Sequence, residues 1–116
     1  MAVFVHEAWL ALAKGADSRA PGAAVTVALC GHPEHEGPCR SPHHTSAEPK
    51  GGKLVVRILF AVETADEPVV REQIVEALRA GRVANEGPEK RWTLLSDTPA
   101  NPSADEATRG IRLGEG

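Results

Sequence analysis

The clearest alternation of hydrophobic and polar positions lies in residues 53–63, KLVVRILFAVE. Every second position there is apolar, which predicts a β-strand with one side against the core. The members of that face are Leu54, Val56, Ile58, Phe60 and Val62. Residues 23–30, AAVTVALC, alternate between bulky and small side chains. We interpret them as a second strand, which ends at Cys30.

The hydrophobic spacing changes after residue 63 and becomes helical. Its apolar stripe is formed by Val70, Ile74, Ala77 and Leu78. Positions i, i+4, i+7 and i+8 lie on one side of an amphipathic helix. Thr64 or Asp66 is placed to cap its start, and Gly81 fits the position just after its end.

Three further segments have weaker patterns. Residues 3–13 suit either one helical face or the beginning of a strand, and residues 91–96 suit a strand. The pattern of residues 97–116 predicts a loop-rich tail. Within it, residues 111–113 either add a short edge strand or have no regular structure. Within that tail we interpret Asp97, Asp105 and Glu106 as solvated turn residues.

These segments predict one α+β domain over residues 1–116. We expect a small sheet with one or two helices packed on one face. A long Cys/His-rich loop, within residues 31–52, would join two of the strands. A ferredoxin-like arrangement is one candidate for the topology, although a second complete βαβ unit is not visible in the pattern.

Composition narrows the possible partners. The net charge is −3 and the chain has two Phe, two Trp and no Tyr. A protein that binds nucleic acid without sequence preference would carry a basic surplus, so we expect no nucleic-acid partner. The longest apolar run is too short to span a membrane. The N-terminus has no basic region typical of a signal peptide, which favours a cytoplasmic location.

The residues best suited to bind a metal or to react are concentrated in residues 30–44, CGHPEHEGPCRSPHH. The chain has two cysteines and five histidines, and both cysteines and four of the histidines fall in this stretch. Such clustering is typical of a metal site. A small core with few aromatic residues would also gain from a bound metal or a cross-link.

The spacing of these donors predicts which of them bind the ion. Our preferred ligands are Cys30, His32, Cys39 and His43, with His35 and His44 as substitutes or neighbours of the site. His43 and His44 are adjacent, and in an extended backbone their side chains diverge, so both are not expected on the same ion. Mixed thiolate and imidazole ligands favour zinc, while nickel, copper and iron stay open.

Three other interpretations of the segment stay open. Cys30 and Cys39 are close enough in sequence to form a disulfide, although the cytoplasm disfavours one. The segment can also be a solvated loop with reduced cysteines. Cys30 beside His32 allows a thiolate nucleophile, but a cysteine that ligates metal is not available for that role.

The spacing Cys30-x8-Cys39-x3-His43 is similar in part to that of CCCH zinc fingers. The third cysteine of that family is absent here, since only Arg40, Ser41 and Pro42 separate Cys39 from His43. The segment also lacks the aromatic residues that stack on RNA bases. We therefore infer neither membership of that family nor RNA binding.

The leading functional hypothesis is a metal-binding protein whose Cys/His loop orders a surface for a protein partner or a second copy. The alternative is a small metal-dependent hydrolase or lyase with an open metal position, in which Glu34 or Glu36 acts as general base. A metal carrier that passes on its ion is a third class. His6 is expected as an ordinary histidine unless the fold brings it to the metal.

Overall fold

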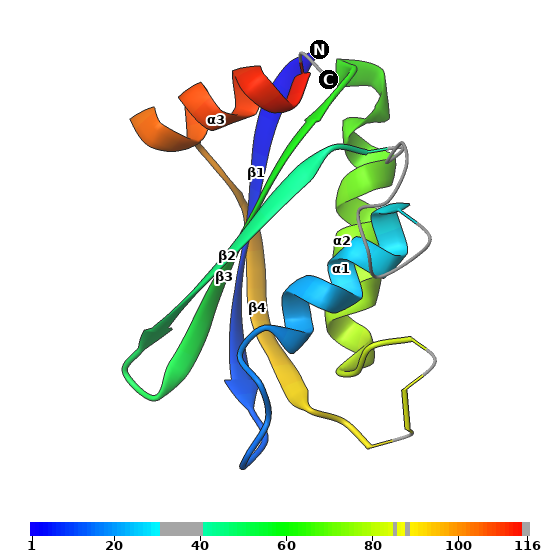
Figure 1. Ribbon diagram of the computed structural model, residues 1–116, viewed down its shortest axis with the longest axis vertical. Helices are drawn as coiled ribbons and strands as arrows, with labels where there is room; N and C mark the ends of the chain where they lie inside the picture. Colours follow the sequence, from blue (N-terminus) through cyan, green and yellow to red (C-terminus); the bar gives the residue numbers. More distant parts are fainter. Residues whose placement is uncertain (31–40, 85, 88, 115–116) are drawn as a thin grey trace.

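The computed structural model describes residues 1–30, 41–84, 86–87 and 89–114, and its centre is a four-stranded antiparallel sheet. The strands are β1 (Ala2–Leu12), β2 (His43–Lys50), β3 (Lys53–Val62) and β4 (Trp92–Ala100). The helices are α1 (Ala20–Cys30), α2 (Glu67–Ala80), which follows the single 3₁₀ turn Thr64–Asp66, and α3 (Ala104–Gly114). The predicted single α+β domain is confirmed. Helices α1 and α2 lie on one side of the sheet and α3 on the other (Figure 1).

The order of the strands in the sheet is β2-β3-β1-β4. Helix α1 connects β1 to β2 with β3 between them, and α2 connects β3 to β4 with β1 between them. Each connection is thus a split βαβ unit, the kind of unit from which a ferredoxin-like arrangement is built. The ferredoxin-like name itself stays a prediction.

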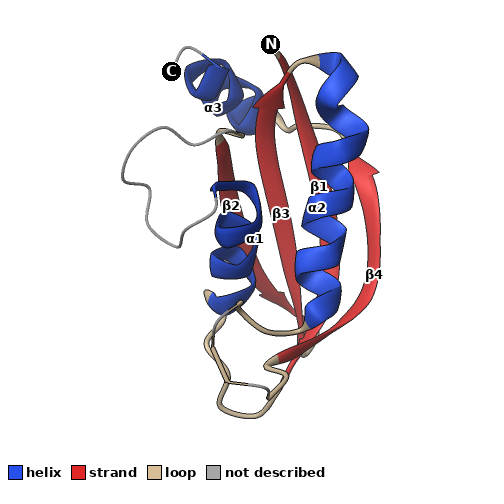
Figure 2. Ribbon diagram, turned by 90° about the vertical axis from the view of Figure 1, so that its right-hand side faces the viewer, coloured by secondary structure: helices blue, strands red, loops and turns tan. Residues whose placement is uncertain are grey.

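The hydrophobic core fills the space between the sheet and the pair α1 and α2 (Figure 2). The predicted face of β3 supplies its centre, and Val25 from α1 and Ile74 from α2 are fully buried against it. Trp92 is 1% exposed, and its indole N–H donates to the carbonyl of Leu78 at 2.7 Å. Gly81 ends α2 with φ 77°, as predicted for the residue after that helix.

The strand predicted for residues 23–30 is wrong, because these residues belong to α1. Alanine favours helix, and Pro21 fits the first helical turn. Burial follows helical spacing, since Pro21, Val25 and Leu29 lie inward at steps of four residues. The alternation of bulky and small residues was therefore a misleading signal. The Cys/His segment consequently connects a helix to a strand, and not two strands.

The predicted loop over residues 31–52 is too long, since residues 43–50 form β2. The sequence HHTSAEPK has no apolar alternation, because β2 is an edge strand and most of it is exposed. Its pairing with β3 is fixed by a two-residue turn at Gly51 and Gly52, whose φ values are 59° and 79°. Positive φ at both positions is what a tight hairpin turn requires.

The loop-rich tail predicted for residues 97–116 is also wrong. Strand β4 continues to Ala100, and α3 follows, so residues 111–113 are helical. Ser103 and Glu106 form a capping box: the Glu106 amide donates to Ser103 Oγ at 3.2 Å, and the Ser103 amide donates to Glu106 Oε1 at 2.9 Å. Residues 3–13, which allowed helix or strand, form the strand β1.

Candidate functional site

The two ends of the Cys/His segment meet at one corner of the domain. Cys30 is the last residue of α1 and His43 is the first residue of β2. Pairing of β2 with β3 sets His43 opposite Phe60, and its side chain turns inward beneath α1. Cys30 Sγ lies 3.9 Å from His43 Nδ1, although the two residues are 13 positions apart. The structure therefore brings two of the four preferred metal ligands side by side.

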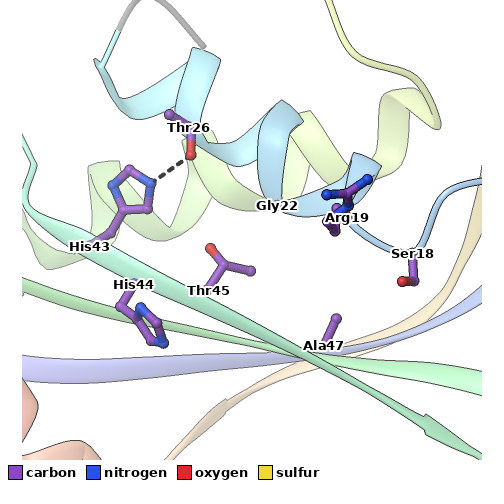
Figure 3. Close-up of a pocket in the computed structure, with 8 residues that line it drawn as sticks. All are labelled: Ser18, Arg19, Gly22, Thr26, His43, His44, Thr45 and Ala47. Atoms are coloured by element: carbon purple, nitrogen blue, oxygen red, sulfur yellow. Dashed lines mark hydrogen bonds between the residues drawn. The ribbon is translucent and has the colours of Figure 1, made fainter. Parts of the chain in front are cut away.

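His43 is 8% exposed, and both nitrogens of its ring have partners. Nδ1 lies 3.0 Å from the carbonyl oxygen of Ser41, and Nε2 lies 3.0 Å from Thr26 Oγ1 (Figure 3). A carbonyl oxygen only accepts, so Nδ1 carries the proton and donates to Ser41. In the neutral ring, Nε2 then accepts from the Thr26 hydroxyl. One turn of α1 thereby fixes the orientation of the imidazole.

Cys30 is disulfide-bonded in this structure. The other half of that bond lies outside the described residues. A sulfur in a disulfide is not a thiolate, and the thiolate is the form that binds metal. Ligation by Cys30 therefore applies to the reduced chain and stays a prediction.

Five of the predicted site residues lie outside the described residues. They are His32, Glu34, His35, Glu36 and Cys39. His44 is described, and it is exposed while His43 is buried, so the two side chains diverge as expected. Partial loss of water around the ring, and then the positive charge of Arg109, lower the pKa of His44. Among residues 1–30, 41–84, 86–87 and 89–114, no group of three or more His, Cys, Asp or Glu side chains is arranged to hold a metal.

A cleft of about 410 Å³ opens between α1 and β2 on the side of His43 that faces Thr26 (Figure 3). Its lining residues are Ser18, Arg19, Gly22, Thr26, His43, His44, Thr45 and Ala47. A side chain on Gly22 would place its Cβ 3.3 Å from Thr45 Cγ2, so the helix and the strand approach closely there. Sequence reasoning missed this cleft because it assigned α1 as a strand and β2 as loop.

His6 lies in a separate polar cluster between β1, β4 and α2. Its Nε2 is 2.8 Å from Asp97 Oδ1, and its Nδ1 is 3.0 Å from Nη1 of Arg71. Arg71 also donates to the carbonyl of Val5 at 2.9 Å. The interpretation of Asp97 as a solvated turn residue is thus wrong, and the fold does not bring His6 to Cys30 or His43.

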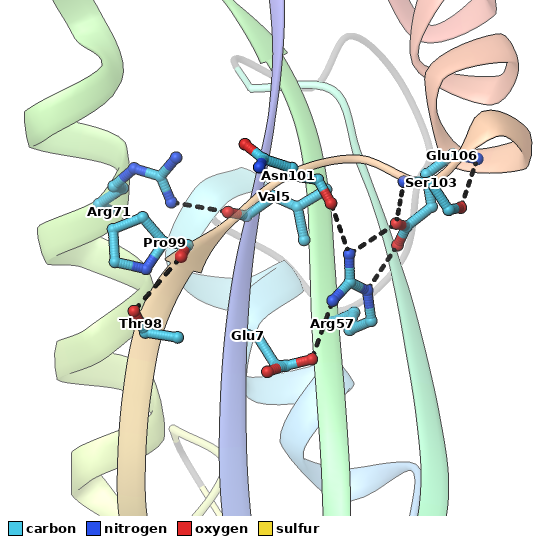
Figure 4. Close-up of polar contacts among 9 residues, drawn as sticks. All are labelled: Val5, Glu7, Arg57, Arg71, Thr98, Pro99, Asn101, Ser103 and Glu106. Carbon is cyan, nitrogen blue, oxygen red and sulfur yellow. Dashed lines mark hydrogen bonds and ion pairs between the residues drawn. The ribbon is translucent and has the colours of Figure 1, made fainter.

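A second polar cluster joins α3 to the sheet (Figure 4). Arg57 donates to both carboxylate oxygens of Glu106, at 2.9 and 2.7 Å, and to Glu7 at 2.8 Å. The hydrogen bonds from Arg57 hold the pKa of Glu106 at about 2. Glu106, also interpreted as a solvated turn residue, is therefore a structural contact of α3.

No protein family matches this sequence, and neither a curated protein nor a solved structure matches the chain. Among the helices of the described residues, none is long and apolar enough to cross a membrane.

Proposed function

We propose that the protein is a small metal-binding protein whose Cys/His segment, in its reduced form, holds a divalent ion, with zinc as the first candidate. The observation that carries the proposal is the 3.9 Å between Cys30 Sγ and His43 Nδ1. Two donors bound to one tetrahedral zinc at about 2.3 and 2.0 Å lie roughly 3.5 Å apart. The two ligands therefore need only a small shift to share an ion.

Binding would change the chemistry of both residues. The disulfide of Cys30 must first be reduced by a dithiol, which is itself oxidised to a disulfide while the protein gains two thiols. Each thiol that binds zinc then releases its proton. His43 would give up its Nδ1 proton and its bond to Ser41, and Nε2–H would donate to Thr26. A hydrogen bond of this kind to the second ring nitrogen orients and strengthens metal-ligating histidines.

The remaining ligands would come from the preferred set, His32 and Cys39, with His35 or His44 as substitutes. We propose that the bound ion orders the segment between α1 and β2, which then contacts a protein partner or a second copy. A cytoplasmic location fits this proposal, since thiols stay reduced there. Nickel, copper or iron would be bound by the same donor atoms.

Elemental analysis of the reduced protein tests the proposal directly. Protein reduced with a dithiol, incubated with zinc and desalted without oxygen should retain about one zinc per chain. Cys30→Ser and His43→Gln should each weaken retention at least 10-fold. His44→Gln should retain zinc if His44 is only a substitute. Reduced wild-type protein that retains no zinc, nickel, copper or iron would overturn the proposal.

No contact among the described residues supports the other two hypotheses, a metal-dependent enzyme and a metal carrier. Glu34 and Glu36, the expected bases of the enzyme, lie outside the described residues. Zinc that exchanges within seconds, while the fold stays intact without it, would favour the carrier over the structural site.

A further inference from the structure

The cleft between α1 and β2 has a chemical character of its own. The polar side chains that face it are three hydroxyls, the imidazole of His43 and the guanidinium of Arg19, whereas His44 points away from it (Figure 3), and none of its eight described lining residues is Asp or Glu. Thr26 donates to His43 and His43 donates to Ser41, so the donors offered to a ligand are the hydroxyls of Ser18 and Thr45 and the guanidinium of Arg19. A cleft with donors and no carboxylate in its walls favours a ligand that accepts hydrogen bonds.

Thr45 gives the cleft an unused hydrogen-bonding group. Its Oγ1 is buried and has no hydrogen-bond partner among the described residues. Thr45 projects from β2 toward Gly22 of α1 (Figure 3). A buried hydroxyl without a partner is unfavourable, and a ligand atom that accepts from it removes that cost.

Arg19 lies at the rim of the cleft, where α1 begins. Its side chain is 89% exposed, and Asp17 accepts from its Nε at 3.2 Å and from its Nη2 at 3.0 Å. Those two bonds use two of the five N–H donors of the guanidinium, so three stay available. Asp17 also offsets part of the positive charge, which limits the affinity for an anion.

We propose that this cleft binds a small oxyanion, either a phosphate or a carboxylate group, between Arg19 at the rim and Thr45 at the floor. The site is distinct from the proposed metal site, although His43 borders both. The two sites lie on opposite sides of the His43 ring. The metal would bind Nδ1, which faces Cys30, whereas the cleft lies on the side of Nε2, which faces Thr26. Planar Arg donors and a hydroxyl are the groups that proteins use for phosphate and carboxylate.

Amide NMR titrations of the oxidised protein, freed of metal on a chelating resin, test this proposal without any metal. Sodium phosphate and sodium acetate are added separately at constant ionic strength, with sodium chloride as the reference. We expect saturable shifts at the amides of Gly22 and Thr45. The anion that saturates at the lower concentration identifies phosphate or carboxylate as the preferred group.

Matched variants separate the site from general charge effects. Arg19→Gln and Thr45→Val should each weaken binding about 10-fold, as loss of a hydrogen bond to a charged ligand does. Thr45→Ser keeps the hydroxyl and should keep the affinity. Asp17→Asn frees the guanidinium and should strengthen binding. Arg82→Gln, which removes an arginine outside the cleft, should change nothing.

Three results would overturn the proposal. Shifts that do not saturate, or that chloride reproduces, would mean that the cleft has no anion site. Equal affinity of wild type and Arg19→Gln would exclude the guanidinium from binding. Saturable binding of neutral glycerol at the same amides, without phosphate or acetate binding, would assign the cleft to uncharged ligands instead.

Discussion

His6 and Asp97 are joined by a 2.8 Å contact between Nε2 and Oδ1, across 91 positions of sequence. Arg71 donates to the other ring nitrogen of His6, so the proton of the neutral ring lies on Nε2 and is donated to Asp97. The His6 side chain is 4% exposed, whereas Asp97 is 28% exposed. The Asp97 carboxylate, near the surface, thus accepts the hydrogen bond of the buried His6 imidazole. This contact adds a side-chain link between the edge strand β4 and β1.

Asp97→Ala should lower the free energy of unfolding by about 1–2 kcal/mol, because it leaves the buried Nε2–H of His6 without its acceptor. Urea denaturation followed by circular dichroism measures the change. Ser96→Ala removes an exposed neighbour in the same strand and serves as the control. Equal stability of Asp97→Ala and Ser96→Ala would show that water replaces the carboxylate at no cost.

Gly110→Ala should destabilise the protein by about 1–3 kcal/mol, despite the higher helix propensity of alanine. The added Cβ would lie 2.8 Å from Val3 Cγ2 and closer still to Cγ1, so α3 cannot keep its position on β1. Thermal denaturation measures the loss. Gly114→Ala, in the same helix, meets Ala61 at an ordinary 3.9 Å and should be tolerated. A Gly110→Ala variant as stable as wild type would refute the close contact with Val3.

The stability that Glu106 contributes should depend on pH between about 4.5 and 2. Its pKa falls from 4.5 to about 2 in the folded protein, chiefly because Arg57 donates two hydrogen bonds to its carboxylate. The contribution is therefore complete above pH 4.5 and is lost as the pH falls toward 2. Partial exposure to water limits it to about 1–2 kcal/mol.

Comparison of wild type with Glu106→Gln across pH measures this contribution. The difference in unfolding free energy should be constant from pH 7 to pH 5 and should shrink below pH 4.5. Asp105→Asn, at the neighbouring position, serves as the control for charge at the start of α3. A difference between wild type and Glu106→Gln that does not change between pH 6 and pH 3 would contradict the pairing with Arg57.

Thr26 should influence zinc binding if His43 is a ligand. Thr26→Val removes the oxygen that would accept from Nε2–H, and loss of such a partner weakens metal binding about 10- to 100-fold. Thr26→Ser keeps the oxygen and should bind like wild type. Competition with a chromophoric chelator, under reducing conditions, measures both affinities. Unchanged affinity in Thr26→Val would argue that His43 does not bind the ion.

The parts of the fold with strong periodicity could be predicted from sequence. Strand β3 is buried on its predicted face, and α2 has the predicted stripe and the predicted Gly81 terminus. Strand β2 could not be found in this way, because an edge strand needs no apolar alternation. Its detectable signal was the Gly51-Gly52 pair, which favours a hairpin turn.

The errors at α1 and α3 have different causes. In α1 the bulky residues alternate by chance, whereas its alanines favour helix and its inward positions follow steps of four residues. In α3 a usable signal was present, since Ser103 and Glu106 have the spacing of a capping box. The Pro-rich sequence before it favoured a loop and hid that signal.

The candidate sites were predictable only in part. Clustering in sequence identified Cys30 and His43, and the structure places them in contact. Pairings between distant residues, such as His43 with Thr26, depend on the assignment of α1 as a helix. Because that assignment was wrong, neither the orienting hydroxyl nor the cleft was accessible from sequence.

The short distance between Cys30 and His43 also affects how the chain tolerates change. The fold itself brings the two ends of the intervening segment together, because β2 pairs with β3 and α1 packs on the same sheet. The entropic cost of closing a loop grows only slowly with its length. We therefore expect changes in the number of residues between these two anchors to put little strain on the sheet. In evolutionary terms, this is a place where new binding chemistry can be tried on an unchanged scaffold.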